Sequence, residues 1–222
     1  MPEAAPHIRV VESPRPMRVA IVGGTGAFGR GLAGRLRDQG LDVAIGSRDA
    51  VRAKELGSTL GVASGTNEGV VRAADYVILA VQSSAAVGTA RDLAEAIGRK
   101  PLLCVASDLH FGSDGVSPGR SEGSIAEDVA AIVHGPVVSG YQALPAAHLA
   151  RHEPPDQDVL VCGDDADAKQ LALELGEGLV AGRAIDAGPL ANARALEGMT
   201  AVILHVNRRY RAVAGLRITG VP

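Results

Sequence analysis

Aromatic side chains are scarce in this sequence. Phe, Tyr and Trp together make up 2 % of the 222 residues, and Trp is absent. Apolar residues nevertheless reach 46 %, and Gly occurs 28 times. A core of this kind is built from small and aliphatic side chains, whose limited bulk lets backbones approach one another closely. The composition therefore favours a layered α/β structure, either one good-sized domain or one domain with a small extension.

The sequence also contains few cysteines, no excess of basic residues and no long apolar run. Only Cys104 and Cys162 occur, both in apolar runs, which indicates buried thiols in a reducing compartment and no disulfide framework. The 22 basic residues are outnumbered by 25 acidic ones, which argues against the basic surface of a nucleic-acid-binding protein. No apolar run approaches the ~20 residues of a membrane-spanning helix. We therefore expect a cytoplasmic protein that binds neither nucleic acid nor membrane.

The first sixteen residues differ from the rest of the chain. The stretch MPEAAPHIRVVESPRP contains four prolines and lacks the apolar core of a secretory signal. We interpret residues 1–16 as a flexible extension and expect the folded unit to begin at Met17.

From Met17 onward, apolar runs of strand length alternate with helical patterns. Near-continuous apolar runs such as YVILAV, residues 76–81, are typical of parallel strands covered on both faces. The alternation predicts a doubly wound α/β fold. Strands are expected at 18–22, 42–45, 76–81, 102–106, 136–140, 158–162 and 183–186, and helices near 27–39, 50–60, 67–74, 84–98, 122–133, 166–180 and 189–207.

A glycine-rich loop joins the first expected strand to the first expected helix. The spacing Gly24-x-Gly26-x-x-Gly29 matches the dinucleotide-binding fingerprint, in the strand–loop–helix context that such a site needs. The first glycine permits a tight turn, the second lets a pyrophosphate approach the backbone, and the third lets the helix pack closely. Free amides and the helix dipole attract the phosphates. The loop predicts a Rossmann-type parallel sheet that binds a dinucleotide, and an ordinary glycine-rich turn is the alternative.

The end of the second expected strand distinguishes NADP from NAD. An NAD site carries an acidic residue there for the ribose hydroxyls. Here Ser47 and Arg48 follow the strand, and Arg52 comes about one helical turn later. A hydroxyl donor and two guanidiniums suit a 2′-phosphate, so we expect NADP(H), with Asp49 capping the next helix. The alternative is two solvated arginines at the start of a helix.

Two other patterns do not support a further site, whereas a third predicts a binding loop. GVSPG at 115–119 matches a nucleophile elbow by spacing, but Ser117 lacks the flanking strand and helix. His148 and His152 are four residues apart, but no third ligand follows, so we interpret them as surface histidines and expect no metal. The long loop 107–121 is rich in Gly, Ser and Asp and predicts a binding loop or a lid.

The sequence resembles the F420-dependent NADP reductases, which transfer a hydride between NADP(H) and the deazaflavin coenzyme F420. The resemblance runs from about Met17 to the C-terminal end. The motifs that carry it are MRVAIVGGTGAFGRGLAGRL, GSRDAVRA, TARDLAEAI, CGDDADAK and DAGPLANARALEGMTAVIL.

The resemblance implies a set of binding residues. Thr25, Gly26, Ala27 and Phe28 would hold the pyrophosphate, and Ser47, Arg48 and Arg52 the 2′-phosphate. Beside the nicotinamide we expect Val81, Ser107 and Ala146. No catalytic acid or base is expected, because both cofactors are themselves hydride carriers.

The acceptor half of the sequence departs from the family pattern. Gln82–Ser84 replace a proline followed by an aromatic residue, Gln142 stands where a histidine is common, and ASDL at 106–109 replaces an SPL-like segment. Tyr141 is a candidate replacement for the aromatic contact. An NADPH-dependent reductase of another small acceptor, such as an imine or a flavin, and a non-enzymatic NADPH-binding module therefore remain alternatives.

We divide the chain into residues 17–140, an NADP-binding Rossmann domain, and residues 141–222, a smaller C-terminal part with a small helical extension that completes the acceptor site. Val202, Ile203 and Val206 predict a contact between two subunits of a homodimer. The basic residues after them, Arg208, Arg209, Arg211 and Arg217, could meet the acidic deazaflavin tail, a partner subunit or only solvent.

Overall fold

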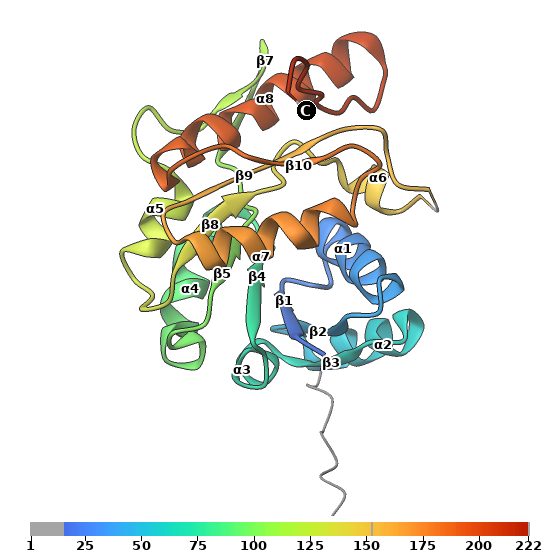
Figure 1. Ribbon diagram of the computed structural model, residues 1–222, viewed down its shortest axis with the longest axis vertical. Helices are drawn as coiled ribbons and strands as arrows, with labels where there is room; N and C mark the ends of the chain where they lie inside the picture. The colour runs from blue at the N-terminus through green and yellow to red at the C-terminus, as the bar shows by residue number, and fades with distance from the viewer. Residues whose placement is uncertain (1–15, 152, 222) are drawn as a thin grey trace, which may run out of the picture.

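An eight-stranded sheet with helices on both faces forms the framework in the computed structural model, which describes residues 16–151 and 153–221 (Figure 1). Its strands are β1 (Arg18–Val22), β2 (Asp42–Ser47), β3 (Ala63–Thr66), β4 (Tyr76–Leu79), β5 (Leu102–Cys104), β8 (Val137–Gly140), β9 (Val159–Gly163) and β10 (Ala184–Asp186). The remaining strands, β6 (Leu109–Gly112) and β7 (Gly115–Pro118), form a separate antiparallel hairpin. The helices are α1 (Ala27–Asp38), α2 (Ala50–Leu60), α3 (Asn67–Arg72), α4 (Ser83–Ile97), α5 (Ile125–Ala130), α6 (Ala146–Leu149), α7 (Ala166–Glu177), the 3₁₀ turn η1 (Leu190–Asn192) and α8 (Ala193–Tyr210).

The strand order is β10-β9-β8-β5-β4-β1-β2-β3, and all pairs from β8 to β3 are parallel. The chain reverses its direction of winding between β1 and β4, which lie side by side at the centre. Loops that leave the carboxyl ends of these two strands diverge to opposite faces and leave a crevice there. The topology confirms the expected doubly wound Rossmann-type sheet.

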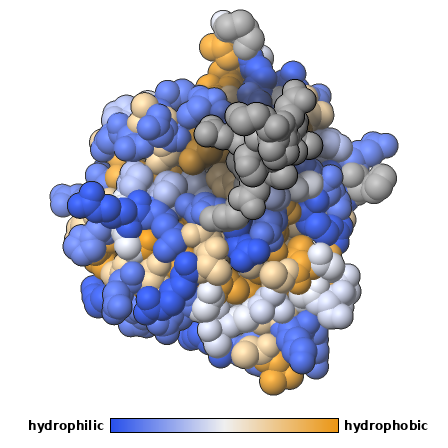
Figure 2. Space-filling view, turned by 60° about the horizontal axis from the view of Figure 1, so that its bottom comes forward, coloured by the Kyte–Doolittle hydropathy of each residue, from blue (hydrophilic) through white to orange (hydrophobic). Residues whose placement is uncertain are grey.

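Alternate residues of the central strands contribute to two separate cores. Ala20 and Val22 of β1 face α3, α4, α5 and α8, whereas Val19 and Ile21 face α1, α6 and α7. Helices therefore cover both sides of the sheet, which explains why its strands are nearly continuous apolar runs. The molecular face in Figure 2 is mainly hydrophilic, with smaller hydrophobic areas between.

Three parts of the fold differ from the sequence expectation. β3 was not expected, because its sequence ASGT has no apolar run, and β2 alone pairs with it at the sheet edge. Much of the loop 107–121 forms the β6–β7 hairpin, which packs along α8. β9 runs antiparallel to β8, and β10 then pairs parallel to β9, so the sheet is mixed at this edge. Strands from both sides of residue 140 belong to the eight-stranded sheet.

Of the expected extension, only Pro16 falls within the described residues, and His152 also lies outside them. No helix in the described part of the chain is long and apolar enough to cross a bilayer.

A buried carboxylate attaches α8 to the rest of the molecule. Glu197 is only 4 % exposed, and its Oε1 accepts the backbone N–H groups of Ile125 at 2.9 Å and Ala126 at 3.3 Å. These amides open α5, so one side chain joins two helices far apart in sequence. Burial raises the pKa of Glu197 to about 7, although the two amides and the nearby Arg120 guanidinium oppose the shift.

This carboxyl group makes stability depend on pH. Between its ordinary pKa of 4.5 and its folded pKa of about 7, the native state binds more protons than the unfolded state. The free energy of unfolding should therefore fall as pH rises through this window, by on the order of 2–3 kcal/mol at 1.36 kcal/mol per pKa unit. Urea unfolding of Glu197→Gln at pH 5 and pH 8 should show a smaller difference than the natural chain. An equal difference in both proteins would contradict the assignment.

Candidate active site

The glycine loop between β1 and α1 is held against β2 by its backbone. The amides of Gly23 and Gly24 each donate to the carbonyl oxygen of Gly46 at 3.2 Å. The left-handed conformation falls on Gly23, with φ of +82°, and not on Gly24, to which the sequence interpretation assigned the tight turn. Gly24 is required for a different reason, because a Cβ atom there would lie 2.6 Å from the Cβ of Ile45.

The other two glycines of the fingerprint have different surroundings. A Cβ on Gly29 would lie 2.7 Å from the carbonyl oxygen of Gly23, so this residue lets α1 pack closely on the loop. A Cβ on Gly26 would meet no atom closer than 3.4 Å, so the protein itself leaves this position open. Gly26 is the N-cap of α1, whose first turn carries no acidic residue and whose first amides lack acceptors within the helix. The open position at a helix N-terminus fits an approaching pyrophosphate.

Ser47, Arg48 and Arg52 lie beside this loop, at the carboxyl end of β2. They line a cavity of about 410 Å³ together with Gly23, Thr25 and Gly26, which we call the loop cavity. Within the described residues neither guanidinium forms an ion pair. Two cations that no described carboxylate pairs with therefore lie at the position expected for a 2′-phosphate.

The neighbouring side chains orient this corner. The Oγ atom of Ser47 accepts the Asp49 N–H at 3.1 Å, which leaves the hydroxyl proton of Ser47 available to a ligand or to Thr25 Oγ1, 3.5 Å away. Asp49 Oδ1 accepts the Arg52 N–H at 3.0 Å and caps α2, as expected. Asp49 is thus occupied by the helix and does not act as the acidic residue of an NAD site.

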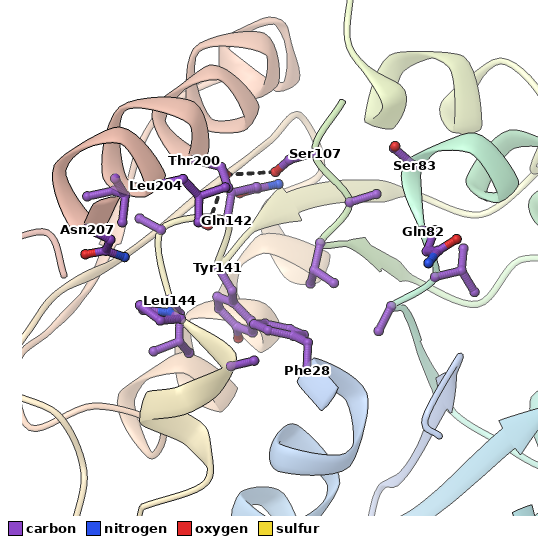
Figure 3. Close-up of a pocket in the computed structure, with 18 residues that line it drawn as sticks. Phe28, Gln82, Ser83, Ser107, Tyr141, Gln142, Leu144, Thr200, Leu204 and Asn207 are labelled. Atoms are coloured by element: carbon purple, nitrogen blue, oxygen red, sulfur yellow. Dashed lines mark hydrogen bonds between the residues drawn. The ribbon is translucent and has the colours of Figure 1, made fainter. Parts of the chain in front are cut away.

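A second cavity of about 310 Å³, the apolar cavity, lies at the carboxyl ends of β4, β5 and β8 (Figure 3). Ala80, Val81 and Gln82 line both cavities, so the two adjoin beyond the end of β4. The wall is mainly apolar and comes from segments spread over the whole chain: Phe28, Val81, Val105, Tyr141, Leu144, Ala146, Ile203 and Leu204. Planar rings of low polarity suit such a space.

Three polar groups at one side of the apolar cavity form a directed chain of hydrogen bonds. Thr200 Oγ1 donates to the carbonyl oxygen of Gln142 at 3.0 Å and lies 2.9 Å from Ser107 Oγ (Figure 3). Because the Thr200 proton is already used, Ser107 donates to Thr200. The remaining lone pairs of Ser107 make it an acceptor toward the cavity. Thr200 was not expected from the sequence, since only the packing of α8 brings it to residue 107.

The residues that depart from the family pattern form part of this wall. Gln142 is 8 % exposed, and its Nε2 donates to Ser139 Oγ at 2.7 Å and to the Cys104 carbonyl oxygen at 3.3 Å. The ring of Tyr141 faces Phe28, and its hydroxyl donates to the carbonyl oxygen of Ala172 (Figure 3). Burial raises the pKa of Tyr141 well above its usual value, so the phenol stays neutral and is no proton source near neutral pH.

The structure also shows the surroundings of residues that the sequence analysis considered for other roles. His148 is buried and not at the surface, with Nδ1 3.1 Å from Gln157 Oε1. Ser117 lies in β7 of the hairpin, a context unlike a nucleophile elbow, as expected. Arg217 forms an ion pair with Asp156 and is thereby separated from the other C-terminal arginines. Ile203, which the sequence interpretation grouped with Val202 and Val206, lines the apolar cavity.

The different roles of Gly26 and Gly29 can be separated by mutation. Gly26→Ala should leave the Tm nearly unchanged and weaken NADPH binding about tenfold or more, equivalent to ~1.4 kcal/mol, because the added methyl occupies only ligand space. Gly29→Ala should cost about 1–3 kcal/mol of stability through overpacking. Calorimetric unfolding and NADPH titration of both variants test this. Equal losses of stability would contradict the assignment of Gly26.

The chain is similar to known proteins over most of its length. The profile of the family described as "NADP oxidoreductase coenzyme F420-dependent" matches residues 18–107. The chain is 35 % identical to the F420-dependent NADP reductase of Methanothermobacter thermautotrophicus, over 93 % of this chain and 96 % of that protein. It is 32 % identical to the corresponding reductase of Methanocaldococcus jannaschii, over 92 % of this chain and 99 % of that protein.

The fold is also similar to a solved structure. A crystal structure from Arthrobacter sp. FB24, of a protein provisionally assigned as an F420-dependent NADP reductase, matches with a TM-score of 0.82 at 24 % identity, over 92 % of this chain and 100 % of that chain. At this identity the likeness concerns the fold alone. On the identity to its curated relatives over nearly its whole length, the chain belongs to the family of F420-dependent NADP reductases.

Proposed function

We propose that this protein transfers a hydride between NADP(H) and the deazaflavin coenzyme F420. The observation that carries the proposal is the junction at Ala80–Gln82, where the loop cavity meets the apolar cavity. A dinucleotide with its pyrophosphate on the glycine loop would extend past Val81 and bring its nicotinamide into the apolar cavity. A second planar ring could stack on it there.

The residues of this chain bind and orient the two rings. The nicotinamide and deazaflavin rings supply the hydride chemistry themselves. Phe28, Val105 and Leu204 exclude water from the apolar cavity, and the fixed chain Ser107–Thr200–Gln142 presents hydrogen-bonding groups at one side. Preorganised walls of this kind lower the barrier by holding the reacting carbons about 3–3.5 Å apart. No side chain needs to exchange a proton.

The expected division of the chain belongs to the same proposal. Residues 17–140 would bind the nucleotide, and residues 141–222 would complete the acceptor site through Tyr141, Leu144 and α8. The two free, buried cysteines are compatible with a reducing compartment, which supports work in the cytoplasm.

Loss of deazaflavin absorbance in the presence of NADPH tests the reaction. Arg48→Ala should raise the KM for NADPH about tenfold or more, because a charge-assisted contact to the 2′-phosphate is worth roughly 1.5–3 kcal/mol. The KM for NADH should stay almost unchanged, since NADH has no such phosphate. Equal effects on both nucleotides would refute the 2′-phosphate site, and turnover of an imine or a flavin but not of F420 would refute the acceptor.

We also propose that the protein is a homodimer formed through an outer face of α8. Val202, Val206 and Tyr210 follow one another at intervals of four residues and so lie along one stripe of the helix. Val202 is 60 % and Tyr210 is 74 % exposed in the single chain. Covering such side chains with a second copy would remove apolar surface from water.

Size-exclusion chromatography with light scattering tests this face. Val202→Asp should convert the dimer to a monomer, because association would bury an unpaired charge. The Tm of the monomer should change little, since Val202 is outside both cores. Val51→Asp, an exposed valine on α2, is the matched control and should leave the dimer intact. A natural chain that is already monomeric would refute the proposal.

A further inference from the structure

A third cavity, of about 410 Å³, lies between the tip of the β6–β7 hairpin and the last two turns of α8, and we call it the arginine cavity. The hairpin closes tightly over the helix here. Gly115 has φ of +129°, and a Cβ on it would lie 3.0 Å from His205 Nδ1. The helix side of the wall is formed by His205, Arg208, Arg209 and Arg211, and the hairpin side by Ser113 and Asp114.

The charge of this cavity is strongly positive. Arg208, Arg209 and Arg211 are exposed, and none of them forms an ion pair with another described residue. The single carboxylate in the wall, Asp114, accepts a hydrogen bond from Ser113 Oγ at 3.1 Å. Three guanidiniums within four positions form a local concentration of positive charge in a chain whose net charge is −3. The arrangement favours an anionic ligand.

Complementation of the helix dipole does not explain all three arginines. Arg208 and Arg209 lie in the last turn of α8, where a positive charge stabilises the helix. Arg211 lies beyond it, at the C-cap, with φ of 51° and ψ of 44°. Glycine adopts this left-handed conformation at lower cost and commonly ends helices in this way. The presence of arginine at such a position points to a use for its side chain.

The arginine cavity and the apolar cavity share no lining residue, but neighbouring residues of α8 line both. Leu204 and Asn207 line the apolar cavity (Figure 3), Arg208 is the next residue, and Arg211 follows Asn207 by four positions. Four residues correspond to about 6 Å along a helix. A ligand whose ring system fills the apolar cavity can therefore extend a substituent past Asn207 toward the arginines.

We propose that the arginine cavity binds the anionic tail of the hydride acceptor. This inference rests on the proposed function, because coenzyme F420 carries a phosphodiester and carboxylates on the chain attached to its ring. Guanidiniums form paired hydrogen bonds with both groups. The tail does not take part in hydride transfer, so its contacts change the affinity for the acceptor and leave the chemical step unaltered.

Kinetics with two acceptors test the tail site. F420 is compared with the tail-free deazaflavin that ends at the ribityl hydroxyl, each with saturating NADPH. The double variant Arg208→Ala/Arg211→Ala should raise the KM for F420 about 10- to 100-fold, as expected for the loss of one or two charged contacts. The kcat, the KM for NADPH and the KM for the tail-free acceptor should not change. Lysine at both positions should restore part of the affinity.

Salt and a matched variant provide the controls. In the natural chain, added salt should raise the KM for F420 but not that for the tail-free acceptor, and the double variant should lose this difference. Arg194→Ala removes the same charge from an exposed position near the start of α8 and should change neither KM.

Each contrary outcome has a distinct meaning. If the double variant changes both KM values equally, or neither, the tail site is refuted while the proposed function stands. A loss of the dimer with an unchanged ratio of the two KM values would assign the arginines to a subunit contact and overturn the inference. If the natural chain reduces neither deazaflavin, the proposed function itself fails and the tail site fails with it.

Discussion

The contact between the glycine loop and the carbonyl oxygen of Gly46 is the constraint on which the candidate site depends. Two consecutive amides, of Gly23 and Gly24, donate to this single acceptor. The next residues after Gly46 are Ser47 and Arg48, so the same contact fixes the distance between the loop and the basic corner. A side chain on Gly24 would collide with Ile45, and one on Gly46 with Asn67 and Val70. Gly23, Gly24 and Gly46 therefore fix the relative position of the glycine loop and the basic corner, the two parts of the loop cavity.

The apolar cavity depends on a different principle, the docking of α8 onto the sheet. Glu197 attaches this helix to the amides that open α5, and one turn later Thr200 bridges Ser107 and Gln142. A buried carboxylate is costly to desolvate, and here backbone donors offset part of that cost. Because the same helix also lines the arginine cavity, its position relative to the sheet affects the packing around the rings and the surface that we propose for the acceptor tail.

The chemistry that these surroundings favour is transfer between two bound rings without a protein acid or base. The buried phenol of Tyr141 is neutral and already donates to a backbone carbonyl, and the thiol of Cys104 has its pKa raised to about 12 by burial. At the wall, the hydroxyls of Ser107 and Thr200 and the carbonyl group of Gln142 are joined by hydrogen bonds, which fixes the direction of these groups. A site of this kind orients the reacting rings and excludes water, which are the two requirements of hydride transfer.

Local sequence was sufficient where a role depends on neighbouring residues. The strand–glycine–helix succession, the serine and arginines after β2 and the cap at Asp49 were all predictable, because each follows from spacing within a few residues. Even there, the left-handed turn falls on Gly23, one residue before the fingerprint, which the spacing alone did not distinguish. The sequence also determined the alternation of strands and helices, since burial on both faces requires near-continuous apolar strands. Only the tertiary structure decided that Thr200 meets Ser107, that Ile203 lines the apolar cavity, that β9 runs antiparallel to β8 and that His148 is buried. These outcomes depend on how segments far apart in the chain pack together, and neither the periodicity nor the propensity of a single segment contains that information.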